Sequence, residues 1–341
     1  MSALPSFLPQ PVIVTRLRAA GCVFAEDEAR LLISTARTPS DLTDMVDRRV
    51  AGLPLEHVLG WADFCGLRIA VDTGVFVPRR RTEFLVHQAV ALARRTAGPT
   101  GRSHPAVAPA DPTGSLAPSA PSDPSDPLGP PDPEALAVPA GQVPDRPRII
   151  VDLCCGSGAV GAALVAALGR VESHSVDIDP AAVRCARRNL AAADGLVYEG
   201  DLYEPLPATL RGRVDILTAN APYVPTGAIG LLPPEARVHE PRVALDGGAD
   251  GLEIQRRVAA EAALWLAPGG HLLIETSERQ APQTAETFAR NGLIPRVVDS
   301  DELDATVVIG TMPDSHMPVP HMPVPHPPRC PARDREMGGF G

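Results

Sequence analysis

Apolar and polar residues alternate with a helical period in the first part of the chain. In residues 26–36 apolar side chains recur at helical spacing, which predicts an amphipathic helix. Thr38 followed by Pro39 is typical of a helix start, with a capping residue before a proline in the first turn. A second apolar run at helical spacing comes after this pair. These patterns predict a small all-α unit over residues 1–60.

Shorter apolar segments follow this helical region. Residues 67–71 and 75–77 are rich in β-branched and other apolar residues, and they flank Asp72-Thr73-Gly74, a sequence typical of a tight turn. This arrangement predicts a β-hairpin, which is followed by a helical pattern over residues 82–95. We therefore expect residues 61–97 to form a hairpin and a connecting helix.

Strand and helix patterns then alternate from residue 148 to residue 311. Such alternation predicts an α/β fold, with a mostly parallel sheet covered by helices on both faces. Strands are expected at residues 148–153, 172–178, 196–199, 214–219, 270–275, 294–298 and 305–309. Helices are expected at residues 158–168, 180–192, 252–266 and 279–291.

Two proline-rich stretches interrupt these patterns. Residues 98–147 consist mainly of Pro, Ser, Asp, Ala and Gly, and residues 312–341 contain the sequence His-Met-Pro-Val-Pro twice. Neither stretch can bury enough apolar surface to offset the entropy lost on ordering, so both are predicted to be disordered. Spaced histidines can bind a metal, but an extended proline-rich tail is the simpler interpretation. No metal site is predicted.

The composition excludes several classes of function. The 341 residues include no lysine, which excludes Schiff-base enzymes and the usual phosphate-loop nucleotide triphosphatases. A formal charge of −10 argues against a sequence-independent grip on nucleic acid. The six cysteines show no regular spacing, so neither a zinc site nor a disulfide framework is indicated. Because no targeting pattern or membrane span is visible, we expect a soluble cytoplasmic protein.

A glycine-rich turn follows the first strand of the alternating region. Asp152 ends the buried strand, and the turn runs Cys154-Cys155-Gly156-Ser157-Gly158 into a helix. Glycines let backbone amides approach a ligand closely, and the helix N-terminus offers free N–H groups. Asp177 lies 19 residues beyond Gly158, at the end of the next strand, where a carboxylate can accept hydrogen bonds from a ribose. We predict a nucleoside-containing ligand.

Two such ligands compete, a nicotinamide dinucleotide and S-adenosylmethionine. Asp152 favours the methyl donor, because a carboxylate at this position suits a cationic sulfonium and not an anionic pyrophosphate. Asp201 ends the third strand, where it can accept from an adenine amino group. An ordinary turn or helix-capping aspartate fits that position equally well.

The fourth strand ends in Asn220-Ala221-Pro222-Tyr223. Ligands of open α/β sheets bind beyond the carboxyl ends of strands, so this segment should face the same crevice as the glycine turn. The Asn220 side-chain oxygen and the Ala221 carbonyl can each accept one N–H of an acceptor NH2 group, which turns its lone pair toward a methyl donor. Tyr223 can stack on a planar acceptor. A proline-stiffened loop with a buried tyrosine is the structural alternative.

These motifs together resemble a known family. Residues 151–159 resemble motif I of class I S-adenosylmethionine-dependent methyltransferases, and residues 220–223 resemble the N-P-P-Y sequence of amino methyltransferases. Further segments are similar to the HemK/PrmC-type protein-(glutamine) methyltransferases, namely residues 52–60, 64–66, 75–79, 82–83, 240–248 and 251–252.

The resemblance implies a helical substrate-binding domain joined through a β-hairpin to a seven-stranded, Rossmann-like methyltransferase domain at residues 148–311. It implies methylation of a glutamine side-chain amide, in the GGQ loop of a peptide chain release factor or, in one branch, in a ribosomal protein. The donor, S-adenosyl-L-methionine, would lie against residues 154–158, Asp177, Leu202 after Asp201, and Asn220. The glutamine would lie against residues 220–223.

The chain departs from the family pattern at three places. Ala221 replaces the first proline of N-P-P-Y, which makes the loop less rigid but keeps the backbone carbonyl. Cys154 replaces a glycine and could narrow the donor site. Arg80 and Arg81 replace a Pro-Glu pair, and they form either a solvated helix start or a contact with an acidic part of a protein substrate.

Three other functions remain open from the sequence. The acceptor could be an exocyclic amine of RNA or DNA, although the negative charge makes nucleic acid an unexpected partner. The chain could bind the donor without catalysis, or it could be a dehydrogenase. We expect no membrane partner and a monomer.

Overall fold

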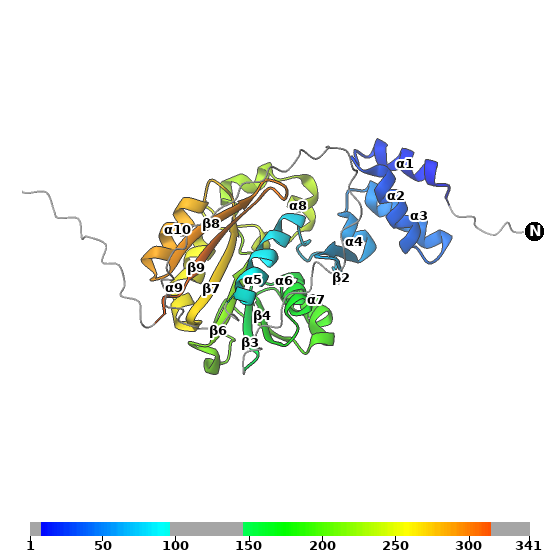
Figure 1. The fold of residues 1–341 in the computed structure, drawn as a ribbon. Helices are drawn as coiled ribbons and strands as arrows, with labels where there is room; N and C mark the ends of the chain where they lie inside the picture. Colours follow the sequence, from blue (N-terminus) through cyan, green and yellow to red (C-terminus); the bar gives the residue numbers. More distant parts are fainter. Residues whose placement is uncertain (1–7, 96–145, 315–341) are drawn as a thin grey trace, which may run out of the picture.

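The computed structural model describes residues 8–95 and 146–314. Four short helices and a hairpin precede a seven-stranded sheet that lies between layers of helices (Figure 1). The stretches predicted to be disordered, residues 98–147 and 312–341, fall outside the described residues except at 146–147 and 312–314. Their disorder therefore stays a prediction.

The four N-terminal helices bury their apolar sides against one another. Their bounds are α1 Gln10–Ala19, α2 Ala25–Thr35, α3 Pro39–Val50 and α4 Leu55–Leu59. Thr38 is the predicted cap, since its side chain accepts a hydrogen bond from the Asp41 amide at 3.1 Å. Ile13, Leu32 and Leu42 are fully buried in the shared core. The helical unit therefore has an apolar core of its own.

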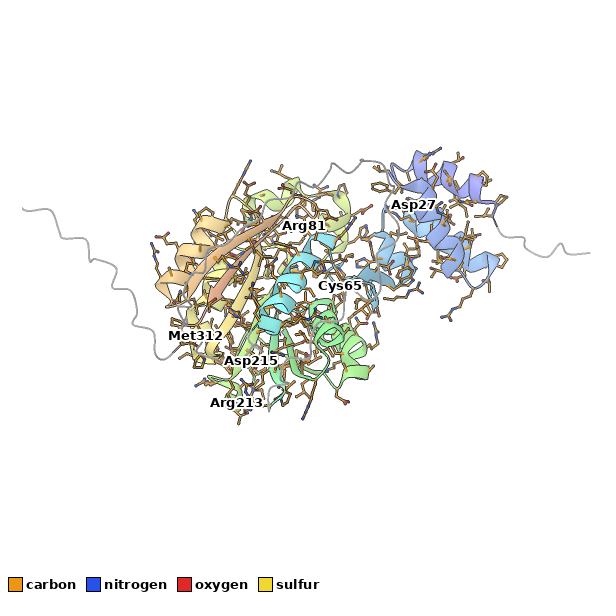
Figure 2. All side chains as sticks on the ribbon, viewed as in Figure 1. Asp27, Cys65, Arg81, Arg213, Asp215 and Met312 are labelled. Atoms are coloured by element: carbon orange, nitrogen blue, oxygen red, sulfur yellow. The ribbon has the colours of Figure 1, made fainter. Side chains whose placement is uncertain are left out.

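The hairpin lies earlier in the chain than the sequence predicted. It pairs β1 Trp61–Phe64 with β2 Leu67–Ala70, whereas strands at residues 67–71 and 75–77 were expected. Cys65 and Gly66 both have positive φ, 49° and 72°, as a two-residue hairpin turn requires. The Cys65 amide donates to the Glu83 carboxylate at 2.9 Å, so the turn that carries Cys65 (Figure 2) is held against Glu83.

Residues 75–77 do not pair because their backbone has other partners. The Val77 amide donates to the Glu240 carboxylate at 3.2 Å, and Arg79 forms an ion pair with the same carboxylate at 2.5 Å. The Val75 amide closes a turn onto the Asp72 carbonyl. This segment therefore joins the hairpin to the loop that carries Glu240.

Seven strands form one mixed sheet. Their bounds are β3 Arg148–Leu153, β4 Val171–Asp177, β5 Leu196–Glu199, β6 Val214–Ala219, β7 Leu266–Thr276, β8 Ile294–Ser300 and β9 Ala305–Thr311. Their order is β5-β4-β3-β6-β7-β9-β8. The first five strands in this order are parallel, and β9 is antiparallel to both of its neighbours. The predicted seven-stranded α/β sheet is confirmed.

Helices cover both faces of the sheet. Their bounds are α5 Glu83–Arg95, α6 Ala159–Leu168, α7 Pro180–Leu190, α8 Pro234–His239, α9 Glu253–Trp265 and α10 Ala281–Arg290. Ile150 packs into the core formed with α5 and α6, whereas Ile149 and Val151 pack into the core formed with α9 and α10. This follows from the period of two along a strand.

The topology brings the carboxyl ends of four strands together at one edge of the sheet. β3, β4, β5 and β6 are parallel and therefore end at the same edge. The strand order reverses between β3 and β6, and such a switch point opens a crevice. The glycine turn and the Asn220 loop both start at this edge.

A buried ion-pair cluster fastens the helical unit to the rest of the chain. Arg49 on α3 contacts Glu28 on α2 and Glu235 on α8, each at 2.6 Å. The Arg49 and Glu28 side chains are about one-tenth exposed or less, while Glu235 is half exposed.

In the described part of the chain, no helix has the length and the apolar character that a membrane span needs.

Candidate functional site

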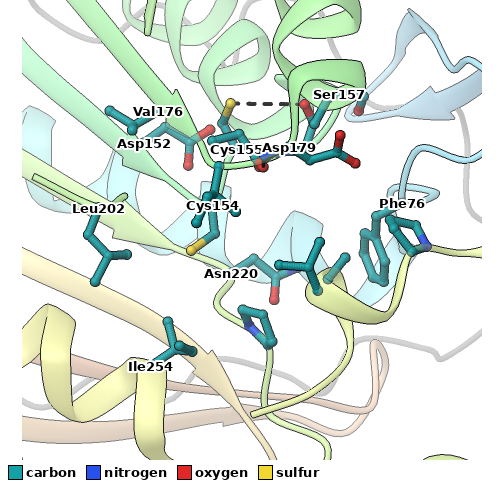
Figure 3. A pocket seen from close by; sticks show the side chains of 18 of the residues that line it. Phe76, Asp152, Cys154, Cys155, Ser157, Val176, Asp179, Leu202, Asn220 and Ile254 are labelled. Atoms are coloured by element: carbon teal, nitrogen blue, oxygen red, sulfur yellow. Dashed lines mark hydrogen bonds between the residues drawn. The ribbon is translucent and has the colours of Figure 1, made fainter. Parts of the chain in front are cut away.

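A cavity of about 610 Å³ opens at the carboxyl ends of β3 to β6 (Figure 3). Most of the site residues predicted from the sequence line it: Asp152, Cys154, Cys155, Gly156, Ser157, Asp177, Asp201, Leu202, Asn220 and Pro222. Gly158, Ala221 and Tyr223 do not line it. The structure thus brings the glycine turn and the Asn220 loop to one cavity.

The glycine turn requires its two glycines for different reasons. Gly156 has φ of 55°, and a Cβ atom there would meet no protein atom within 4 Å, so the space beside it is open. Gly158 has φ of 78°, and a Cβ atom there would lie 3.0 Å from the Ala186 Cβ. Gly156 therefore borders the cavity, whereas Gly158 lets α6 begin close to α7.

Asp152 is held inside the protein at the end of β3. It is 1% exposed, and its carboxylate accepts from the Thr218 hydroxyl at 2.9 Å and from the Gly161 amide at 3.2 Å. Burial raises the pKa of Asp152 to about 7, although both hydrogen bonds oppose this rise. Its charge therefore changes near neutral pH.

Asp177 braces the glycine turn. One carboxylate oxygen accepts from the Gly156 amide at 2.8 Å, and the other accepts from the Asp179 amide at 2.9 Å. Burial raises the pKa of Asp177 above its ordinary value, and these backbone hydrogen bonds partly offset the rise. The carboxylate and the turn thus hold each other at the cavity wall.

Two residues of the cavity have a left-handed backbone without being glycine. Cys154 has φ of 54° and Leu202 has φ of 49°, a conformation that costs a side chain roughly 1–2 kcal/mol. Burial raises the pKa of the Cys154 thiol well above its ordinary value, so the thiol stays protonated. Asp201, beside Leu202, pairs with Arg257 of α9 at 2.7 Å.

Apolar residues from several elements complete the walls. Val176 and Ile178 flank Asp177, and Leu202 and Ile254 lie on the opposite side of the cavity from Val176 (Figure 3). Ile178 is 52% exposed and lines the cavity. Sequence patterns did not indicate Ile254 or Arg257, because both lie in α9 and reach the cavity only in the folded chain.

The Asn220 loop is fixed by contacts with Thr82, which also lines the cavity, and with Glu275, which does not. The Asn220 side-chain nitrogen donates to the Thr82 hydroxyl at 3.2 Å, and the Tyr223 hydroxyl lies 3.5 Å from a Glu275 carboxylate oxygen. Burial and the nearby Glu275 raise the pKa of Tyr223 to about 12, so its phenol stays neutral and donates. The stacking of Tyr223 on an acceptor, and the use of the Ala221 carbonyl, stay predictions.

The cavity fits S-adenosylmethionine better than a dinucleotide. Its lining carries six carboxylates and two guanidinium groups, a balance that favours a cation over a pyrophosphate. The open space beside Gly156, the Asp177 carboxylate and the apolar walls suit an adenosine unit. Among residues 8–95 and 146–314, no group of three or more metal-ligating side chains is placed to hold a metal.

Known proteins with similar sequences identify the family of this chain. Residues 140–231 match the methyltransferase small domain family. The chain is 31% identical to the release factor glutamine methyltransferase of Geobacter sulfurreducens over 268 residues, which are 78% of this chain and 75% of that protein. It is 32% identical to the enzyme of the same name from Mycolicibacterium smegmatis over 270 residues, 78% of either chain.

A further relative has a different name. The 4-amino-L-phenylalanine/4-methylamino-L-phenylalanine methyltransferase of Streptomyces pristinaespiralis is 29% identical over 283 residues, 82% of this chain and 80% of that protein.

The fold, the cavity and these relatives define an S-adenosylmethionine-dependent methyltransferase with a seven-stranded sheet. Within this class, the chain belongs to the release factor glutamine methyltransferase family.

Proposed function

We propose that this enzyme methylates the side-chain amide nitrogen of a glutamine in a peptide chain release factor, within its GGQ loop. The observation that carries the proposal is the Asn220-Ala-Pro-Tyr loop at the edge of a cavity suited to the methyl donor. Membership of the family supports the acceptor.

The residues of the loop act by positioning. S-adenosylmethionine, when bound, supplies a methyl group on a cationic sulfonium. An amide nitrogen is a poor nucleophile because its lone pair is delocalised into the carbonyl. The Asn220 side-chain oxygen and the Ala221 carbonyl accept its two N–H groups and stabilise the positive charge that develops on it. No strong base is needed, since the alkylated nitrogen is acidic and releases its proton to water.

The donor side of the site uses other residues. Asp177 would accept from the ribose hydroxyls, and Ile178 and Leu202 would cover the adenine. Asp152 would add negative charge near the donor, to the extent that it is ionised. The helical unit contacts α8 through Arg49 and Glu235, and exposed Arg80 and Arg81, just before α5, offer contacts to an acidic protein surface.

Asn220→Ala provides the first test. With labelled donor and release factor from a strain that lacks its methylase, we expect kcat to fall roughly 10²–10³-fold. Asn291→Ala, at the end of α10 and outside the cavity, serves as the control. A release factor whose GGQ glutamine is replaced by alanine should take up no label.

The same assay distinguishes other acceptors. Label on 4-amino-L-phenylalanine, on a ribosomal protein or on RNA, with none on the release factor, would contradict the proposed substrate and keep the enzyme class. Donor binding without transfer to any of these acceptors would contradict catalysis itself.

A further inference from the structure

Asn220 can serve the acceptor in only one of its two amide orientations; this inference rests on the function proposed above. A side-chain amide has an oxygen that accepts hydrogen bonds and an NH2 group that donates them. The substrate also presents an NH2 group. The Asn220 oxygen must therefore face the cavity, because the opposite orientation would place two donors against each other.

Asn220 is tied at its nitrogen end. Its Nδ2 donates to Thr82 Oγ1 at 3.2 Å, and Thr82 is 3% exposed at the end of the short helix η1 Arg80–Thr82. Figure 3 shows the Asn220 oxygen pointing into the cavity. The two residues are 138 positions apart in the chain, so the fold alone brings them together.

The Thr82 hydroxyl holds the nitrogen end of the Asn220 amide. Its oxygen accepts from Asn220 Nδ2, and it lies next to Glu275, which is 1% exposed near the end of β7 and accepts from the Tyr223 hydroxyl at 3.5 Å. While Thr82 accepts from the amide nitrogen, the amide oxygen of Asn220 is left free for the acceptor.

We propose that Thr82 is a positioning residue that selects the productive orientation of the Asn220 amide. A buried hydrogen bond of this kind is stronger than the same contact in water, so it keeps the amide from turning when the substrate enters. Tyr223, bonded to Glu275, is held at the other end of the loop.

Two substitutions of Thr82 separate orientation from packing. Thr82→Val removes the hydroxyl but keeps the shape of the side chain, whereas Thr82→Ser keeps the hydroxyl. In the full-length enzyme we expect Thr82→Val to lower kcat about tenfold or more, and Thr82→Ser to recover it to within about threefold. The Kd of S-adenosylmethionine, measured by calorimetry, should change less than about twofold in either variant.

Thr311→Val is the matched control, since it removes a hydroxyl that contacts His271 at the opposite edge of the sheet. It should leave kcat unchanged. Wild-type kcat in Thr82→Val would overturn the proposal, and so would equal losses in Thr82→Val and Thr82→Ser.

A second measurement needs no acceptor. In the ¹⁵N-labelled full-length protein, the side-chain NH2 signals of Asn220 can be identified by their loss in Asn220→Asp. They should shift in Thr82→Val and stay in place in Thr82→Ser. Unmoved signals contradict the positioning role, whereas absence of label on the release factor contradicts only the proposed substrate.

Discussion

Cys154 combines a left-handed backbone with a side chain at the donor cavity. The positive φ is the same strain that Cys65 bears in the hairpin turn, where its side chain does not line the cavity. A glycine would adopt either conformation without a steric cost. Comparing substitutions of the two cysteines therefore separates the effect of backbone strain from the effect of contact with the ligand.

Cys154→Gly and Cys65→Gly should each raise the free energy of unfolding by about 1 kcal/mol, measured by urea denaturation. Only Cys154→Gly should also change the Kd of S-adenosylmethionine, because only Cys154 lines the cavity. An equal effect of both substitutions on donor binding would show that Cys154 does not shape the donor site.

Asp152 predicts a pH dependence of stability. Its pKa in the folded protein is about 7, above the value near 3.9 in an unfolded chain. Between these values the folded state binds more protons than the unfolded state, so this residue lowers stability as the pH rises from 4 to 7. Above pH 7 this loss of folding stability, on the order of a few kcal/mol, is complete.

Asp152→Asn should abolish this dependence, since an amide can bond to both Thr218 and Gly161 without carrying charge. In urea denaturation between pH 5 and pH 8, the free energy of unfolding of the variant should rise relative to that of the wild type as the pH rises. A constant difference across this range would mean that Asp152 keeps an ordinary pKa.

At the residue scale, the sequence identified side chains that belong to local motifs. Asp152, Asp177 and Asn220 each follow a strand, and strand ends are visible in a hydrophobic pattern. Thr82 has no local pattern, because its role depends on a contact with Asn220, 138 positions away in the chain.

At the element scale, the contact between α3 and α8 depends on charges of unequal burial. Arg49 and Glu28 are buried, whereas Glu235 is half exposed. Removing Arg49 leaves the Glu28 carboxylate buried without a partner, while removing Glu235 leaves Arg49 still paired. The two substitutions should therefore differ in their effects.

Arg49→Ala should lower the free energy of unfolding by about 3–5 kcal/mol. Glu235→Ala should lower it by less than about 1 kcal/mol, but it should raise the KM for the release factor by loosening the helical unit. Urea denaturation measures the two free energies of unfolding, and steady-state kinetics measures the KM. Equal destabilisation by the two would show that the Glu28 pair contributes nothing by itself.

The elements themselves were largely predictable. The seven strands of the sheet were expected within a few residues of their observed bounds, since buried strands are continuous apolar runs. β7 begins at Leu266, earlier than expected, because Leu266 pairs with Val214 across an irregularity in the ladder. The hairpin was misplaced because its turn is Cys65-Gly66, and a cysteine carries no turn signal in the sequence.

At the scale of the whole molecule, the fold class followed from the alternation of strands and helices. The position of the helical unit did not follow, because Arg49 and Glu235 are 186 residues apart. Their contact depends on how the completed sheet presents α8.

Helix α5 runs from the cavity to the opposite edge of the sheet. This helix begins beside Asn220 and Glu275 and ends at Arg95, which borders His271 and Arg296 at the other edge of the sheet. The next described element, β3, starts at Arg148 on that same far edge. Both described ends of the 52-residue stretch between Arg95 and Arg148 therefore lie at the edge opposite the cavity. A fluorescent protein or an affinity tag inserted at this point should leave turnover intact, which makes the junction a site for tracking the enzyme in cells.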